Sequence, residues 1–285
     1  MRRASFSPSF PAAGALGAWL LVACGSGGNA SPPPASPAST PASAVQPPAS
    51  AGATPSIPIT ETARAVVAAP DRSEADKKLD AGRHPAELLS FFHIGPGMKV
   101  AEIAAGGGYT TELLARAVGP TGIVYGENYK FILERFAEKP WSERLAQPAM
   151  KNVVRVDREV EDPFPPEAHD LDAVLCVLFY HDLVWQNADR DKVNAAAFRA
   201  LKHGGLYGIV DHSARAGAGT TETKTFHRIE ESVVKAEVER AGFKLRTEGD
   251  FLRNPNDTRD WNDSPSAAGE RRGTSDRFVL AFEKP

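Results

Sequence analysis

Hydrophobic and polar positions follow three successive patterns along the 285-residue chain. An apolar run occupies residues 12–23, and small uncharged residues with many prolines fill 25–60. From residue 85 onward, helix-like and strand-like apolar patterns alternate. Such alternation is typical of a parallel sheet covered by helices on both faces, so the sequence predicts one α/β domain behind a different kind of N-terminal segment.

The expected elements can be placed from these patterns. Helices are predicted at 85–92, 111–117, 131–146, 189–201 and 230–241. Strands are predicted at 98–104, 123–126, 153–156, 171–179, 206–210, 243–247 and 277–283. The helix at 189–201 is expected to stop at His203-Gly204-Gly205, where glycine can adopt a left-handed conformation.

The N-terminal segment has the features of a signal peptide. Two arginines precede the apolar run, which is too short to span a bilayer and ends in Leu21-Val22-Ala23-Cys24-Gly25. That pattern resembles a bacterial lipobox, in which the cysteine becomes the lipidated first residue of the mature protein. We therefore expect a signal peptide at 1–23, lipidation at Cys24 and a Pro/Ala/Ser-rich disordered tether at 24–60.

This organisation predicts a domain at 61–285 that is lipid-anchored on the periplasmic side of a bacterial membrane, with the outer membrane favoured over the inner. A translation start downstream of the leader would instead give a cytoplasmic protein. The net charge of −3 and the lack of a long basic run argue against a nucleic-acid partner. Cys176 lies within an apolar run and is expected to be a core residue, while the sequence does not indicate an oligomeric state.

A glycine-rich segment follows the first predicted strand. Its residues of interest are Glu102, Ala104, Gly106, Gly107, Gly108 and Tyr109. Glycines at a strand-to-helix turn let backbone N–H groups and the helix N-terminus approach a ligand closely. The dinucleotide fingerprint fits less well, because Thr111 stands where it requires glycine or alanine. A nicotinamide-dependent oxidoreductase is therefore disfavoured.

The segment resembles the cofactor motif of class I S-adenosylmethionine-dependent methyltransferases, with Ala104 in place of the first glycine. The phrases at 133–141, 177–182, 208–213 and 251–255 also resemble a bacterial family of predicted methyltransferases. The resemblance implies a Rossmann-like, seven-stranded, mostly parallel sheet with an antiparallel last strand. It also implies S-adenosylmethionine as cofactor, bound at the glycine loop.

The same resemblance assigns roles to single residues. Glu102 would orient the loop or reach the amino end of the cofactor, or else simply cap loop N–H groups. An acid after the second strand normally contacts the ribose, and here Glu127 and Asn128 are the two alternatives. Asp157 is expected to contact adenine, although an aspartate in a surface turn is an equally ordinary interpretation.

Chemistry-bearing residues also follow the fourth and fifth strands, where ligands bind in open parallel sheets. These residues are Tyr180, His181, Asp182, Asp211 and His212. Either histidine could remove the acceptor's proton, either aspartate could orient the imidazole, and Tyr180 could line the methyl group. Each could also cap a helix or turn. Asp182, Asp211 and His212 form an alternative metal set, by analogy with some catechol-type O-methyltransferases.

The sequence thus predicts a methyltransferase with a small-molecule acceptor that it does not identify. A non-catalytic periplasmic binding module that retains the fold is the alternative, because S-adenosylmethionine is made in the cytoplasm whereas the lipobox indicates export.

Overall fold

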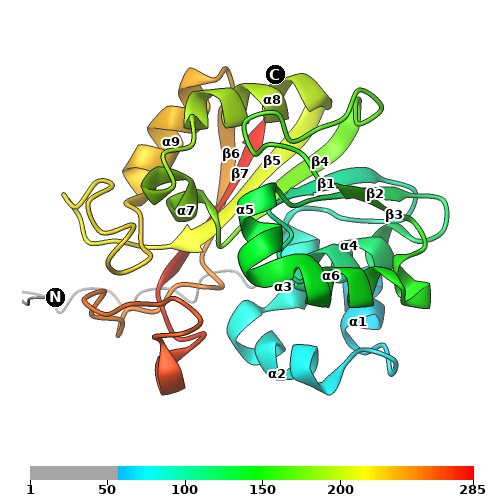
Figure 1. Ribbon diagram of the computed structural model, residues 1–285, viewed down its shortest axis with the longest axis horizontal. Coiled ribbons are helices and arrows are strands. Elements are labelled where there is room, and N and C mark those ends of the chain that lie inside the picture. The colour runs from blue at the N-terminus through cyan, green and yellow to red at the C-terminus, as the bar shows by residue number, and fades with distance from the viewer. Residues whose placement is uncertain (1–56) are drawn as a thin grey trace, which may run out of the picture. The chain divides into compact units, whose positions relative to one another are not determined.

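The computed structural model describes residues 57–285 of the chain (Figure 1). The predicted signal peptide, the predicted lipidation site Cys24 and nearly all of the predicted tether lie outside the described residues. These described residues belong to one compact unit. Within the described part of the chain, no helix is both long enough and apolar enough to cross a membrane.

Seven strands form a single sheet in the order β3-β2-β1-β4-β5-β7-β6. Their bounds are β1 Lys99–Ile103, β2 Ile123–Glu127, β3 Val153–Val156, β4 Leu171–Val177, β5 Leu201–His212, β6 Lys244–Gly249 and β7 Arg277–Glu283. The strands from β3 to β5 pair in parallel, whereas β7 runs antiparallel to both β5 and β6. This confirms the predicted sheet with its antiparallel last strand.

Helices cover both faces of the sheet, with α1 to α4 on one side and α8 and α9 on the other (Figure 1). Their bounds are α1 Glu61–Val67, α2 Glu74–Arg83, α3 Pro85–Phe91, α4 Tyr109–Val118, α5 Lys130–Ile132, α6 Glu138–Leu145, α7 Tyr180–Trp185, α8 Arg190–Ala200 and α9 Glu231–Arg240. Because both faces are covered, β4 is apolar almost throughout, and residues 173–176 are completely buried.

The helices α1 and α2 have no counterpart among the elements predicted from the sequence. The α2 helix buries only Asp76 and carries no apolar stripe. It is held by ion pairs instead: Arg144 of α6 lies 2.7 Å from Asp76, and Arg72 lies 2.7 Å from Asp80. A search for hydrophobic periodicity cannot find a helix that docks through charged side chains.

Two predicted boundaries were wrong. The α8 helix ends at Ala200, and β5 already begins at Leu201, so Gly204 does not terminate the helix. Its left-handed φ of 74° lies within β5, near an irregularity in the pairing with β4. The fourth strand ends at Val177 rather than Phe179, and the short helix α7 begins at Tyr180.

Trp141 of α6 fixes the position of the glycine loop against the sheet. Its side chain is fully buried between the loop and β2. A Cβ atom on Gly108 would lie 2.6 Å from the indole, and one on Gly126 would lie 2.7 Å from it. Glycine at both positions therefore lets the ring pack directly on the backbone of these two segments.

This packing predicts a position-specific cost for adding one methyl group. Gly126→Ala should lower the free energy of unfolding by about 1–3 kcal/mol, because the Trp141 ring would have to move. Gly95→Ala is the matched control, since nothing lies within 4 Å of its added Cβ, and it should change stability by less than about 0.5 kcal/mol. Urea unfolding measures both, and equal costs for the two variants would contradict the packing argument.

Candidate functional site

The glycine loop between β1 and α4 presents an open backbone surface. Ala104, Gly106 and Gly108 all have positive φ, of 53°, 57° and 81°. No atom lies within 4 Å of where a Cβ of Gly106 would stand, so the loop is open at that point. Ala104 therefore occupies a conformation that favours glycine, which agrees with its place in the motif.

The end of β2 holds the loop through two neighbouring side chains. The Asn128 amide is fully buried; it accepts from the Gly106 N–H at 2.8 Å and donates to the Gly106 carbonyl at 3.0 Å. The Glu127 side chain accepts from the Ala104 N–H at 2.9 Å through Oε2. Its other oxygen, Oε1, is buried and has no hydrogen-bond partner among residues 57–285.

These contacts give Glu127 and Asn128 different hydrogen-bonding capacities. Both polar atoms of Asn128 are occupied by Gly106, whereas Glu127 keeps one acceptor oxygen free. Burial raises the pKa of Glu127 to about 8, even though the Ala104 N–H favours its ionised form. The arrangement suits a ligand that donates hydrogen bonds to Glu127.

Glu102 lies beneath the loop at the start of α4. Its carboxylate accepts from the Thr111 hydroxyl, and burial raises its pKa to about 7. This contact ties β1 to the first turn of α4, which is an orienting role for Glu102. Asp157, by contrast, is at the surface and pairs with Arg155 at 2.9 Å, so its contact with adenine stays a prediction.

A cavity adjoins the loop on the side of α3. It is lined by Tyr109 and Thr110 of α4 and by Val177 and Val210 near the ends of β4 and β5, among others. Two guanidinium groups, those of Arg83 and Arg277, also line it. The Arg83 guanidinium lies 4.5 Å from the centre of the Tyr109 ring.

Neither arginine pairs with a carboxylate within the described part of the chain: Arg277 donates to two backbone carbonyls, and Arg83 rests on the Tyr109 ring. Burial lowers the pKa of both groups, to about 10 for Arg277. The cavity therefore offers positive charge to an anionic group. Tyr109 does not present its hydroxyl here, because that group donates to Asp80 of α2 at 2.7 Å.

A second group of polar residues gathers where β4 and β5 end. Asp211 is completely buried and accepts from the backbone N–H groups of His181 and His212, each at 2.7 Å. Its Oδ1 atom also lies 2.7 Å from Nδ1 of His181. Asp211 therefore fixes the start of α7, the end of β5 and the orientation of the His181 ring.

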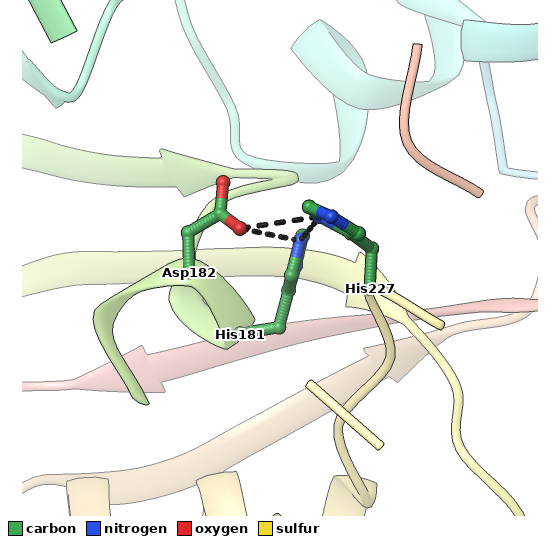
Figure 2. Close-up of side chains that lie close together, drawn as sticks. All are labelled: His181, Asp182 and His227. Carbon is green, nitrogen blue, oxygen red and sulfur yellow. Dashed lines mark hydrogen bonds and ion pairs between the residues drawn. The ribbon is translucent and has the colours of Figure 1, made fainter. Parts of the chain in front are cut away.

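His181 and Asp182 meet a third residue, His227, from the loop after β5 (Figure 2). Asp182 Oδ1 lies 3.1 Å from His181 Nε2 and 3.3 Å from His227 Nδ1. Burial alone would lower the pKa of His181, but the charges of Asp211 and Asp182 outweigh it and raise the pKa to about 10. Asp182 also accepts from the Trp185 indole at 2.5 Å.

His212 belongs to a separate pair. Its Nδ1 atom lies 2.5 Å from Asp263 and 2.9 Å from the Ser275 hydroxyl. Burial lowers the pKa of His212 despite the neighbouring Asp263, so the imidazole is neutral at pH 7. The His212 ring is 5.6 Å from the ring of His181, which places the pair beside the His181 cluster.

The structure brings together four of the five predicted catalytic residues and leaves Tyr180 out. The Tyr180 hydroxyl donates to Glu237 of α9 at 2.9 Å and accepts from Asn194 of α8 at 2.8 Å. The hydroxyl therefore points toward α8 and α9 and away from the His181 cluster. The alternative metal set is not assembled either, because Asp211 is occupied by His181 and His212 faces Asp263.

Three contributors were not assigned from the sequence. His227 and Asp263 lie in long connections far along the chain from His181, and no spacing links them to it. Tyr129 follows β2 directly, and the charges of both Asp182 and Glu127 raise its pKa, after the larger effect of burial. Its ring lies 6.0 Å from that of Phe179, so aromatic side chains line the space between the two polar groups.

No protein-family model matches the chain. Among solved structures, it is similar to a SAM-dependent methyltransferase from Aquifex aeolicus, with a TM-score of 0.53 and 20% identity over 74% of this chain and 97% of that one. A Haloferax volcanii protein described as a candidate methyltransferase, solved with a methyltransferase activator, gives a TM-score of 0.51 and 16% identity over 79% and 98%.

A third similar structure is a candidate sarcosine dimethylglycine methyltransferase from Galdieria sulphuraria, with a TM-score of 0.50 and 15% identity over 74% of this chain and 85% of that one. At such low identities the likenesses establish the fold. The chain has the Rossmann-like fold found in these methyltransferases.

The buried Glu127 predicts an unusual pH dependence of stability. Its pKa rises from an ordinary value of 4.5 to about 8 on folding, so the folded chain binds this proton more tightly than the unfolded chain. The stabilising contribution of that proton is complete below pH 4.5 and is lost as pH rises through 8.

Glu127→Gln cannot titrate, so the free energy of unfolding of the unaltered protein should fall relative to the variant between these pH values, by on the order of a few kcal/mol. Urea unfolding of both proteins at several pH values measures the difference in their free energies of unfolding. The titration of Glu102 contributes equally to both proteins and drops out of that difference. A difference that stays constant with pH would show that Glu127 is ionised in the folded protein.

Proposed function

We propose that this chain is an S-adenosylmethionine-dependent methyltransferase that acts on a small-molecule acceptor. The observation that carries the proposal is the free, buried Oε1 atom of Glu127 beside the open glycine loop. Leaving a buried acceptor without a partner is costly, and a ribose offers two hydroxyl donors at this position of the fold. The residues present therefore fit the cofactor.

The cavity beside the loop supports a second part of the assignment. The amino-acid end of S-adenosylmethionine carries a carboxylate, and Arg83 and Arg277 line the cavity without a carboxylate partner among residues 57–285. Charge-assisted hydrogen bonds from guanidinium groups are well suited to a carboxylate. We assign this cavity to the amino-acid end of the cofactor.

The residues after β5 supply the proton chemistry. Bound S-adenosylmethionine provides a methyl group on a positively charged sulfur. His212 accepts the acceptor's proton, because burial keeps its imidazole neutral and Asp263 orients it through Nδ1. His181 does not serve as the base, since Asp211 and Asp182 hold it in the protonated form. Tyr129 and Phe179 provide an aromatic wall that favours a cationic methyl group.

Calorimetric titration of the purified chain tests cofactor binding. S-adenosylmethionine and S-adenosylhomocysteine should bind in the micromolar range, and Gly106→Arg should abolish binding by filling the open side of the loop. Glu127→Gln should weaken binding by about 10-fold, because the amide offers the ligand one acceptor oxygen fewer at this position. Failure of both compounds to bind, or tight binding of NAD, would exclude the proposal.

The same titration separates the two halves of the cofactor. Arg83→Met should weaken the binding of S-adenosylmethionine but leave the binding of methylthioadenosine unchanged, because methylthioadenosine lacks the amino-acid end. Equal losses for both compounds would contradict the assignment of the cavity. Methyl transfer from labelled cofactor to small-molecule extracts then tests catalysis, and cofactor binding without transfer would indicate the non-catalytic binding module.

The proposed location of the enzyme is the periplasmic side of a bacterial membrane, attached through lipid on Cys24, as the lipobox pattern predicts. Labelled palmitate should enter the chain in growing cells, and Cys24→Ala should abolish the labelling. A soluble, unlabelled chain would instead support a cytoplasmic protein with a downstream start.

A further inference from the structure

The three side chains of Figure 2 direct one potential ligand atom each at a common point. These atoms are Nε2 of His181, Oδ1 of Asp182 and Nδ1 of His227. Their separations are 3.1 Å between His181 and Asp182, 3.2 Å between the two histidines and 3.3 Å between His227 and Asp182. The three atoms thus form a nearly equilateral triangle.

Those separations match the spacing of ligands on one metal ion. Ligand atoms bonded to an ion at about 2.1 Å lie about 3.0 Å apart in octahedral geometry and about 3.4 Å apart in tetrahedral geometry. Hydrogen bonding explains only two sides of the triangle, because each imidazole can donate a proton to Asp182, and it leaves two N–H groups facing each other across the 3.2 Å contact between the histidines. A cation at the centre satisfies all three atoms together.

We propose that His181, Asp182 and His227 bind a divalent first-row transition metal ion. Two imidazole nitrogens and one carboxylate oxygen favour ions of the Zn²⁺, Co²⁺ or Fe²⁺ type over Mg²⁺ and Ca²⁺, which prefer oxygen ligands throughout. Three protein ligands leave at least one coordination position for an exogenous group, as in catalytic rather than structural sites.

The surroundings of His181 are those of a metal-binding histidine. Its Nδ1 atom lies 2.7 Å from Asp211, so Nδ1 keeps its proton for that carboxylate, while Nε2 faces Asp182 and His227 and would give up its proton to solvent when the metal ion binds. Asp211 is itself held by two backbone N–H donors. It is therefore a positioning residue for the site, and the Trp185 indole plays the same part for Asp182.

His227 is held in place by the residues that follow it. Arg228 is completely buried and pairs with Asp257 at 2.7 Å, while Ile229 donates its N–H to the His212 carbonyl at 3.0 Å. The His227 side chain keeps 22% of its surface exposed. The third ligand is thus anchored to the domain, yet it borders solvent, which gives an ion and an exogenous ligand a route in.

The metal would hold an oxygen or nitrogen atom of the methyl acceptor, polarising it next to His212, 5.6 Å from His181 between ring centres. This role rests on the proposed methyltransferase function. Binding of the metal does not, so the two ideas can fail separately.

Titration of the metal-free full-length chain with Co²⁺ and Zn²⁺ tests the site. Co²⁺ should bind one ion per chain with visible absorption bands typical of nitrogen and oxygen ligands, and Zn²⁺ should displace it. His227→Ala should weaken binding by at least about 100-fold, and Asp211→Asn by about 10-fold to 100-fold. The matched control is His212→Ala, which removes a neighbouring histidine outside the triangle and should leave metal affinity unchanged.

Stoichiometric binding that His227→Ala abolishes and His212→Ala preserves would establish the site. The absence of saturable Co²⁺ binding at one ion per chain, or full binding by His227→Ala, would overturn it. Loss of binding in His212→Ala alone would point to the set Asp182, Asp211 and His212 and would also overturn it. Thermal unfolding checks that each variant is folded. S-adenosylmethionine titration of the same samples reports separately on the proposed function.

Discussion

One fully buried carboxylate, Asp211, organises the reactive end of the sheet. It accepts two backbone N–H groups, one from the start of α7 and one from the end of β5, and it fixes the ring of His181 as well. A buried charge with no compensating donors would be strongly destabilising. The three donors therefore offset the cost of burying the Asp211 charge. They also fix two segments 30 residues apart in one geometry.

The order of the strands explains why two sets of chemistry-bearing residues share one edge. Because β1 pairs with β2 on one side and β4 on the other, the glycine loop stands between the end of β2, with Glu127, and the end of β4, with His181. Tyr129 lies close enough to both Glu127 and Asp182 for each to raise its pKa. A ligand held by the loop would thus be presented to the histidines across an aromatic wall.

Charge is handled differently in the two sets. Burial raises the pKa values of Glu102 and Glu127 to about 7 and about 8, so at neutral pH Glu127 is mostly protonated and Glu102 is about half protonated. The carboxylates near His181 are matched by cationic or donor groups, and the pKa of Asp182 is held well below its usual range even though burial opposes this. Glu127 has a buried oxygen without a donor among residues 57–285, whereas the carboxylates near His181 surround a cationic imidazole. The two groups therefore have different chemical roles.

The sequence by itself determined the sheet, its antiparallel last strand and the place of the glycine loop, because apolar periodicity and glycines at a strand-to-helix turn are local signals. It also located His181, Asp182, Asp211 and His212, since parallel strands bring their carboxyl ends to one edge. Only the tertiary structure decided how these residues pair. The direction of the Tyr180 hydroxyl depends on packing against α8 and α9.

His227 and Asp263 come from long connections whose path is set by distant contacts such as Arg228 with Asp257. Which of Glu127 and Asn128 keeps an acceptor oxygen without a partner among residues 57–285 likewise depended on which side chain the Gly106 backbone occupies. Such pairings are made by three-dimensional neighbours, and no spacing along the chain encodes them.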